Sequence, residues 1–440
     1  MKSKLFISIV VFAALIIQSA AQVPVVAPSQ KRPIILTGGT IHTGTGEVIE
    51  NGVVAFSDGK ITWVGKSSES KLDKSTYDII DVTGKQVYPG LIFPNTTLGL
   101  VEIGGVDVTV DSRVIGDLNP NVRAIAAYNT DSHVMPVIRS NGILIAQIVP
   151  QGTLLPGTCS VVQLDAWNWE DAAYKMDNGI IMGWPRKAAA TGRAASFNAQ
   201  IGALTTSSYE KNVEQLEKIF TDAVAYAAIE KPVIVNLRLE AMKGLFDGSK
   251  TLFINSSESK GIISAVSFAK RYGVKKIVLT DASEPAWSVK DFLKENNIPV
   301  LVTNPQSLPV YDHSDIRLPF KLASMFTREG ILVGLCYSKQ AYGNLPFAAG
   351  QTVAYGLTKE EALQTVTLNT AKILGIEDKT GSLEAGKDAN IVVSTGDLLD
   401  MRTNNVVLAY ITGRSIDLDN KHKELNRRFQ AKFDNMKSAK

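Results

Sequence analysis

Residue patterns for binding metals or nucleic acids are scarce in this 440-residue sequence. It has only two cysteines, Cys159 and Cys336, which lie far apart and cannot form a metal site of their own. An oxidising compartment would permit a bridge between them, but two buried thiols are the expected state. The formal net charge is only +3, and the sequence shows no helix-turn-helix, zinc-finger spacing or basic run with interleaved aromatics. No nucleic-acid partner is therefore expected.

Long hydrophobic runs are also missing after residue 21, where no segment reaches 18 apolar residues. Before that point, the 13-residue run LFISIVVFAALII follows the two lysines of MKSK and precedes QSAA. Ser19 and Ala21 are small residues at the cleavage positions, so residues 1–21 are predicted to be a secretory signal peptide. The alternative, an uncleaved membrane anchor, is disfavoured because the run is short. We expect an exported protein, periplasmic or extracellular, with no membrane partner after cleavage.

Short β-branched runs separated by Gly, Asp and Asn turns occupy both ends of the remaining sequence. The N-terminal runs are IILTGGTIHTG, ENGVVAFSDGKITWVGK and DIIDVTG, and the C-terminal ones are GSLEAGKDANIVVSTGD and NNVVLAYITGRSIDL. The segment Ser57–Lys60 has Asp-Gly at its centre, which indicates a hairpin turn. The two ends are therefore predicted to combine into one small sheet domain.

The long middle of the chain alternates short apolar runs with helical stretches such as YEKNVEQLEKIFTDAVAYAAIE. The apolar runs read as buried parallel strands: GILIAQIVP, KPVIVNL, KKIVLTD, IPVLVTN and ILVGLCYS. Repeated β–α units over this length predict a TIM-type barrel or a doubly wound sheet. Thr358 and Glu361 have capping-box spacing at the start of a helix. The basic C-terminus KHKELNRRFQAKFDNMKSAK is expected to be a solvated helix.

Several blocks of sequence resemble the amidohydrolase superfamily, specifically its imidazolonepropionase-like secreted branch. They are ILTGGTIHTGTGEVIENGVVAFSDGKITWVG, VTGKQVYPGLI, and NLPFAAGQTVAYGLTKEEALQTVTLNTAKILGI followed by TGSLEAGKDANIVV. The resemblance implies an α/β fold, a (β/α)8 TIM-type barrel with a composite β-sandwich built from both termini. The expected division is a signal peptide at 1–21, sandwich parts at 22–90 and 379–417, the barrel at 91–378, and a C-terminal helix or tail at 418–440.

The resemblance also implies metal-dependent hydrolysis. In this family zinc or another divalent ion lowers the pKa of a bound water, and the resulting hydroxide attacks an amide or ring C–N bond. The ligands are an Asp-x-His-x-His motif after strand one, a histidine after each of strands five and six, and an aspartate after strand eight. That aspartate also serves as the general base. Residues from such distant segments converge because the carboxyl ends of barrel strands meet at one face.

None of these ligand residues is found where the resemblance places it. PGLI is followed by FPNTT, so Asn95 and Thr97 stand at the two histidine positions. KPVIVNLRLE resembles strand five, with Asn236 at its histidine position, and KKIVLTDASEPAW resembles strand six, with Asp281 near its end. ILVGLCYSKQ resembles strand eight, with Ser338 at the aspartate position. These five residues are predicted to line a pocket of degenerate ligand positions.

The four histidines of the chain fall at none of these positions. His42 and His422 are expected at the surface of the sandwich and the tail, and His133 and His313 in barrel loops. Neutral Asn, Thr and Ser oxygens are weak ligands for Zn²⁺, and one carboxylate, from Asp281, does not compensate. We therefore expect no resident metal or other cofactor.

Two functions remain open from the sequence. By resemblance, the chain is a hydrolase of non-peptide or cyclic amide C–N bonds that has lost the usual ligands. Alternatively, it is an inactive binding or scaffold subunit that pairs with a metal-bearing paralogue. A small-molecule ligand fits both functions. The resemblance also implies a homo-oligomer or such a pairing.

Overall fold

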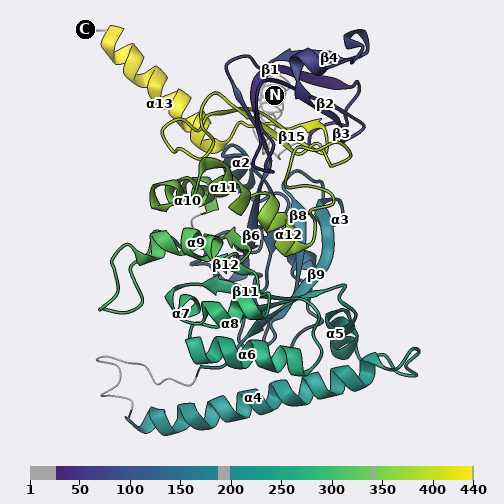
Figure 1. Cartoon of the computed structure of the whole chain (residues 1–440), viewed down its shortest axis with the longest axis vertical. Helices are drawn as coiled ribbons and strands as arrows, with labels where there is room; N and C mark the ends of the chain where they lie inside the picture. The colour runs from purple at the N-terminus through teal and green to yellow at the C-terminus, as the bar shows by residue number, and fades with distance from the viewer. Residues whose placement is uncertain (1–25, 187–198, 338–341, 439–440) are drawn as a thin grey trace, which may run out of the picture.

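The computed structural model describes residues 26–186, 199–337 and 342–438. Figure 1 shows a sheet domain at one end of the molecule, a barrel in the middle, and the long helix α4 (Ala199–Ala227) across the other end. The signal peptide predicted for residues 1–21 lies outside the described residues. Within the described part of the chain, no helix is both long enough and apolar enough to cross a membrane.

Strands from both ends of the chain form the sheet domain. They are β1 (Ile34–His42), β2 (Val48–Ser57), β3 (Lys60–Lys66), β4 (Asp78–Asp81), β5 (Gln86–Pro89), β14 (Ile391–Ser394), β15 (Val406–Ile411) and β16 (Arg414–Ser415). Their order is β16-β15-β14-β5-β1-β2-β3, with β4 beside β1. The two ends of the chain join where β5 pairs antiparallel with β14, Val87 opposite Val393. The composite domain predicted from the sequence is therefore confirmed.

The predicted hairpin turn between β2 and β3 is also present. Asp58 and Gly59 have φ values of 51° and 78°, the left-handed conformations that a tight type I′ turn requires. Short 3₁₀ turns, η1 (Ser67–Glu69) and η2 (Lys74–Thr76), follow this hairpin. The core of the sheet domain packs around Phe56 and Tyr410, whose rings meet edge to face at 4.9 Å.

The barrel is a second eight-stranded sheet. Its strands are β6 (Leu91–Thr96), β7 (Ile143–Ile148), β8 (Gly157–Gln163), β9 (Ala173–Gly183), β10 (Thr251–Asn255), β11 (Ile277–Ala282), β12 (Val300–Val302) and β13 (Val333–Leu335). They are hydrogen-bonded in sequence order, and the end strands β6 and β13 lie against each other, so the barrel is nearly closed. The predicted TIM-type fold is confirmed. One strand, β8, runs antiparallel to both neighbours, because the short connections on either side leave no room for a crossover helix.

Helices cover the barrel, and one further helix projects from the sheet domain (Figure 1). They are α2 (Met135–Arg139), α3 (Trp169–Ala172), α5 (Leu237–Asp247), α6 (Ser259–Arg271), α7 (Glu284–Trp287), α8 (Lys290–Glu295), α9 (Leu318–Arg328), α10 (Leu345–Thr352), α11 (Lys359–Thr365), α12 (Leu368–Leu374) and α13 (Lys421–Ser438). The 3₁₀ turns are η3 (Asp107–Thr109), η4 (Ala124–Ala127), η5 (Tyr342–Asn344) and η6 (Val353–Tyr355). The capping box predicted at the start of α11 is confirmed, with the Thr358 hydroxyl accepting from the Glu361 N–H.

A buried ion cluster joins the barrel to the sheet domain. Asp165, just after β8, accepts from Arg139 of α2 at 2.5 Å and from Arg414 of β16 at 2.8 Å. It also accepts from the backbone N–H of Ala27 at 3.1 Å. Asp165 and Arg139 are only 4% and 5% exposed. One carboxylate thus ties together the N-terminal segment, the barrel and the last sheet strand.

Candidate functional site

Three polar side chains meet at the carboxyl ends of barrel strands β6, β10 and β11. The Asn95 side-chain amide donates to Asp281 Oδ1 at 3.2 Å, and the Asn255 amide donates to Asp281 Oδ2 at 2.7 Å. Asn95 and Asp281 are 186 residues apart in the chain. The structure therefore brings together two of the five residues singled out in the sequence, and adds Asn255.

The backbone at two of these residues is strained. Asn95 and Asp281 have φ values of 53° and 52°, in the left-handed region. Asn and Asp adopt this conformation more readily than other residues with a side chain beyond Cβ. Backbone strain of this kind is common at functional sites, where the surrounding structure holds it in place. Here the Asn95 N–H donates to Gln147 Oε1 at 3.2 Å, which holds the end of β6 against β7.

The hydrogen-bonded chain continues into the barrel interior. The fully buried Gln147 donates from Nε2 to the Cys159 sulfur at 3.4 Å, and that thiol donates to the Gly179 carbonyl at 3.2 Å. Burial raises the pKa of Cys159 to about 12, so the thiol stays protonated at neutral pH and is a poor nucleophile. Cys336 is also buried, and the two cysteines are not bridged. Cys159 is thus linked through Gln147 to the backbone of Asn95.

The prediction that KPVIVNLRLE forms strand five is wrong. Residues 231–236 form no strand, and Val233 and Ile234 are 101% and 83% exposed. Asn236 instead caps helix α5, where its side chain accepts from the N–H groups of Arg238 and Leu239. It lies outside the candidate site because its segment connects two helices on the barrel exterior.

The fifth strand of the barrel is β10, and Asn255 ends it. The sequence signal for this strand was a short apolar run, TLFIN, directly after the Asp247–Lys250 turn. TLFIN has five residues, of which two are β-branched, against three in the seven-residue KPVIVNL, so its strand signal is the weaker one. Asn255 is therefore the site residue that sequence reasoning missed.

Of the two remaining degenerate ligand positions, Thr97 is described by the structure and Ser338 is not. Thr97 is buried directly after β6, and its carbonyl accepts from the Leu100 N–H at 2.9 Å. Ser338 lies outside the described residues. Asp281 is placed as predicted, within β11 and one residue before its end.

A cavity of about 520 Å³ opens beside the three-residue cluster. Asn95, Asn255 and Thr280 line it from the strand ends. Gln151 and Thr153, in the connection between β7 and β8, line it from the side together with further residues of that connection. After β9, Trp184 and the exposed Arg186 complete the wall. Amides, hydroxyls, one indole, the Arg186 guanidinium and several apolar side chains thus surround a space large enough for a small organic molecule.

The carboxylate of Asp281 sets the direction of both neighbouring amides. A carboxylate only accepts hydrogen bonds, so the NH₂ group of each asparagine must face Asp281. The carbonyl oxygens of the same side chains are then left to accept from other donors. Both asparagines line the cavity.

The donor set does not fit a divalent metal ion. Among residues 26–186, 199–337 and 342–438, no three His, Cys, Asp or Glu side chains are placed to hold one. The segments outside these ranges contain none of the four residue types in their sequence. Around Asp281 the neighbours are amides and hydroxyls, and both carboxylate oxygens already accept from asparagine. Zinc selects imidazole, thiolate or carboxylate ligands, and this cluster contains only one of them, the Asp281 carboxylate.

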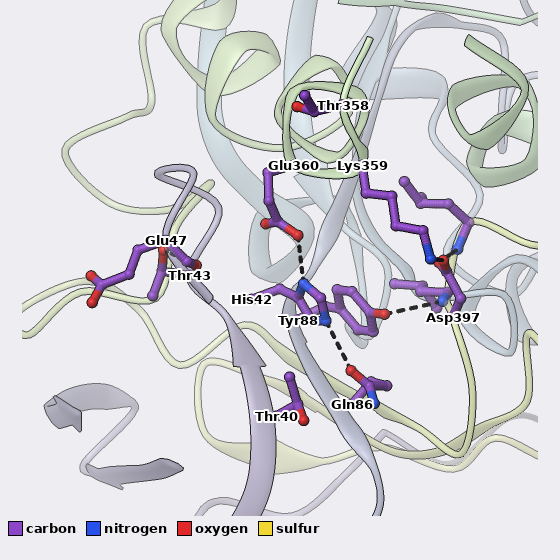
Figure 2. A network of polar contacts seen from close by, with 12 residues as sticks. Thr40, His42, Thr43, Glu47, Gln86, Tyr88, Thr358, Lys359, Glu360 and Asp397 are labelled. Atoms are coloured by element: carbon purple, nitrogen blue, oxygen red, sulfur yellow. Dashed lines mark hydrogen bonds and ion pairs between the residues drawn. The ribbon is translucent and has the colours of Figure 1, made fainter. Parts of the chain in front are cut away.

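The expectation that His42 lies at the surface is wrong. Figure 2 shows its ring between two acceptors, with Nδ1 2.6 Å from Glu360 Oε1 and Nε2 2.9 Å from Gln86 Oε1. The ring stacks on Tyr88 at 4.4 Å. Burial alone lowers the pKa of His42, but the bonds to Glu360 and Gln86 and the negative charges of Glu360 and Asp397 outweigh it and raise the pKa above 6.5. His42 therefore ties β1 to α11.

The remaining histidines also lie away from the cavity. His133 is 71% exposed at its side chain and pairs with Glu102 at 2.9 Å. His313 is an exposed loop residue that stacks on Tyr311, as expected of a histidine in a barrel loop. His422 is exposed at the start of α13. The polar groups at the cavity are thus amides, hydroxyls, the Trp184 indole and Arg186, with Asp281 beside them.

Comparison with known proteins gives matches to one superfamily. The family model described as "Amidohydrolase family" matches residues 251–416. Imidazolonepropionase from Bacillus cereus is 49% identical over 51 residues, which cover 12% of this chain and 12% of that protein. Imidazolonepropionase from Shewanella oneidensis is 64% identical over 36 residues, 8% of this chain and 9% of that protein. The chain thus matches about a tenth of the length of these curated relatives.

The fold has a broader match among solved structures. An amidohydrolase from Thermotoga maritima superposes with a TM-score of 0.74 at 24% identity, covering 87% of this chain and 99% of that one. This likeness concerns the fold. It extends over both the barrel and the sheet domain, whereas the sequence matches to the imidazolonepropionases are short.

Proposed function

Because the chain belongs to the amidohydrolase superfamily, as its sequence predicted, we propose that its barrel cavity binds a small uncharged molecule with an amide or cyclic amide group. We propose further that binding takes place without a resident metal ion. The observation that carries both proposals is the Asn95–Asp281–Asn255 cluster. It stands at the carboxyl ends of strands one, six and five of the barrel, the face where barrel proteins bind their ligands.

The cluster favours a ligand that donates hydrogen bonds. The acceptor oxygens of Asn95 and Asn255 complement the N–H groups of an amide, and the donor groups elsewhere on the wall complement its carbonyl. A cavity of about 520 Å³ suits a ring or short amide. In this role the chain would act as a binding subunit, alone or beside a metal-bearing relative.

A second candidate function is hydrolysis of a non-peptide or cyclic amide C–N bond. Superfamily membership favours it, and so does the strained backbone of Asp281 at the barrel mouth. Each Asp281 oxygen accepts from one asparagine, and each keeps a further lone pair. Asp281 would then orient a water molecule and accept its proton as the water attacks the carbonyl carbon to give a tetrahedral intermediate. The same proton would pass to the nitrogen as the C–N bond breaks, leaving a carboxylic acid and an amine.

A lactam and the matching lactone test the binding proposal. The expected result is that 2-pyrrolidinone binds at least tenfold more tightly than γ-butyrolactone, because the lactone has the same ring and carbonyl but no N–H. Isothermal titration calorimetry of the metal-free protein measures both affinities. Asn255→Leu, which removes an acceptor oxygen and fills part of the cavity, is expected to abolish the difference.

Two results would decide against the binding proposal. Equal affinity for lactam and lactone, or lactam binding unchanged in Asn255→Leu, would remove the Asn95–Asp281–Asn255 cluster from ligand recognition. Ring-opened product from a cyclic amide, formed in the presence of a chelator and lost in Asp281→Asn, would instead establish the hydrolase.

A further inference from the structure

Helix α13 projects from the sheet domain away from the rest of the molecule (Figure 1). It is 18 residues long and contains six Lys and Arg against two Asp and Glu. The whole 440-residue chain carries a formal net charge of only +3. The formal net charge of this protruding helix, +4, therefore exceeds that of the whole chain.

Apolar side chains form a stripe along this helix. Leu425, Phe429, Phe433 and Met436 follow one another at spacings of four, four and three residues, so they share one helical face. Phe429, Phe433 and Met436 are 52%, 54% and 55% exposed. Large apolar side chains gathered on an exposed face mark an interaction surface more often than single ones do. We call these four residues the apolar stripe.

The charged residues are arranged around the stripe in a defined way. At 100° per residue, Lys432 lies on one side of the apolar stripe and Lys437 on the other. The acidic residues Glu424 and Asp434 lie on the opposite face. Lys423 and Arg427 lie on that opposite face as well. An apolar stripe flanked by lysines, with a strongly charged opposite face, is typical of helices that lie in a membrane interface.

We infer that α13 docks the protein on an anionic lipid surface. The apolar stripe would enter the boundary between headgroups and acyl chains, and Lys432 and Lys437 would contact the lipid phosphates. The charge argues against a second copy of α13 as the occupant, because two such helices would bring like charges together. A solvated helix, as expected from the sequence, would not require its large apolar residues to share one face.

Vesicle sedimentation tests this inference on the mature chain from Gln22. The expected result is binding to vesicles of phosphatidylcholine with about 30% phosphatidylglycerol, weak binding to phosphatidylcholine alone, and release as salt is raised. The double variant F429S/F433S should bind at least tenfold more weakly, because it removes two aromatic anchors from the stripe. Its melting temperature should equal that of the unaltered chain, since both side chains are exposed.

The matched control is V233S/I234S. It also replaces two exposed apolar residues with serine, but in the connection between α4 and α5. This control should bind the anionic vesicles as the unaltered chain does. Failure of the unaltered chain to bind them, or equal binding by F429S/F433S, would overturn the inference. A dimer that dissociates in F429S/F433S, without vesicle binding, would also overturn it and assign the stripe to self-association.

Discussion

Asp165→Ala is expected to lower the free energy of unfolding by about 3–5 kcal/mol, the cost of breaking a buried ion pair from one side. The substitution leaves the guanidinium of Arg139, only 5% exposed, without its carboxylate. It also releases Arg414 of the sheet domain and the N–H of Ala27. Urea unfolding followed by circular dichroism measures the change. The effect should be large because one carboxylate serves three separate segments.

The control for this experiment is Asp78→Ala. Asp78 pairs with Arg32 at 2.9 Å, and both side chains are more than half exposed. Solvent screening limits such a pair to about 0–1 kcal/mol, so this variant should unfold close to the unaltered protein. If Asp165→Ala were no more destabilising than Asp78→Ala, the cluster would not be the connection between barrel and sheet domain that its burial indicates.

Asn255→Asp is expected to destabilise the protein by about 2–3 kcal/mol at neutral pH, because a hydrogen bond is replaced by charge repulsion. The side-chain amide of Asn255 donates to Asp281 at 2.7 Å, and a carboxylate there would face a second carboxylate. One of the two acids would then have a raised pKa in the folded state. The penalty is full above that raised pKa and fades as the pH falls toward about 4, where the unfolded acids also bind protons.

Asn255→Ala separates the lost hydrogen bond from the added charge. It should cost about 1 kcal/mol at neutral pH, because it removes one hydrogen bond and adds no charge. Urea unfolding at several pH values measures both variants. Equal penalties for Asn255→Asp and Asn255→Ala at neutral pH would show that Asn255 and Asp281 are not in contact, and would remove the cluster on which the proposed function rests.

Much of the fold could be predicted from local sequence patterns. The Asp58-Gly59 turn and the Thr358–Glu361 capping box depend on a few neighbouring residues, and both are present. The antiparallel β8 was not predicted. Its orientation depends on the lengths of its connections and on pairing with β7 and β9, which the apolar pattern alone does not reveal.

The candidate site was predictable only where sequence landmarks fixed the register. Asn95 lies three residues after PGLI, and Asp281 lies one residue before the end of the apolar strand β11. Asn236 was misplaced because KPVIVNL has strong β character while tertiary packing leaves it exposed between two helices. The surroundings of His42 were also beyond local patterns, since Glu360 lies 318 residues away. Long-range contacts of this kind have no signal in a single sequence.

Elemental mass spectrometry of the purified protein tests the central claim most directly. The claim is that a superfamily barrel binds its ligand through the Asn95–Asp281–Asn255 cluster without a resident metal ion. The expected result is far less than one equivalent of metal per chain, with a melting temperature that does not respond to added Zn²⁺ or Mn²⁺ or to a chelator. About one tightly bound metal per chain, whose removal by chelator lowers the melting temperature, would contradict it.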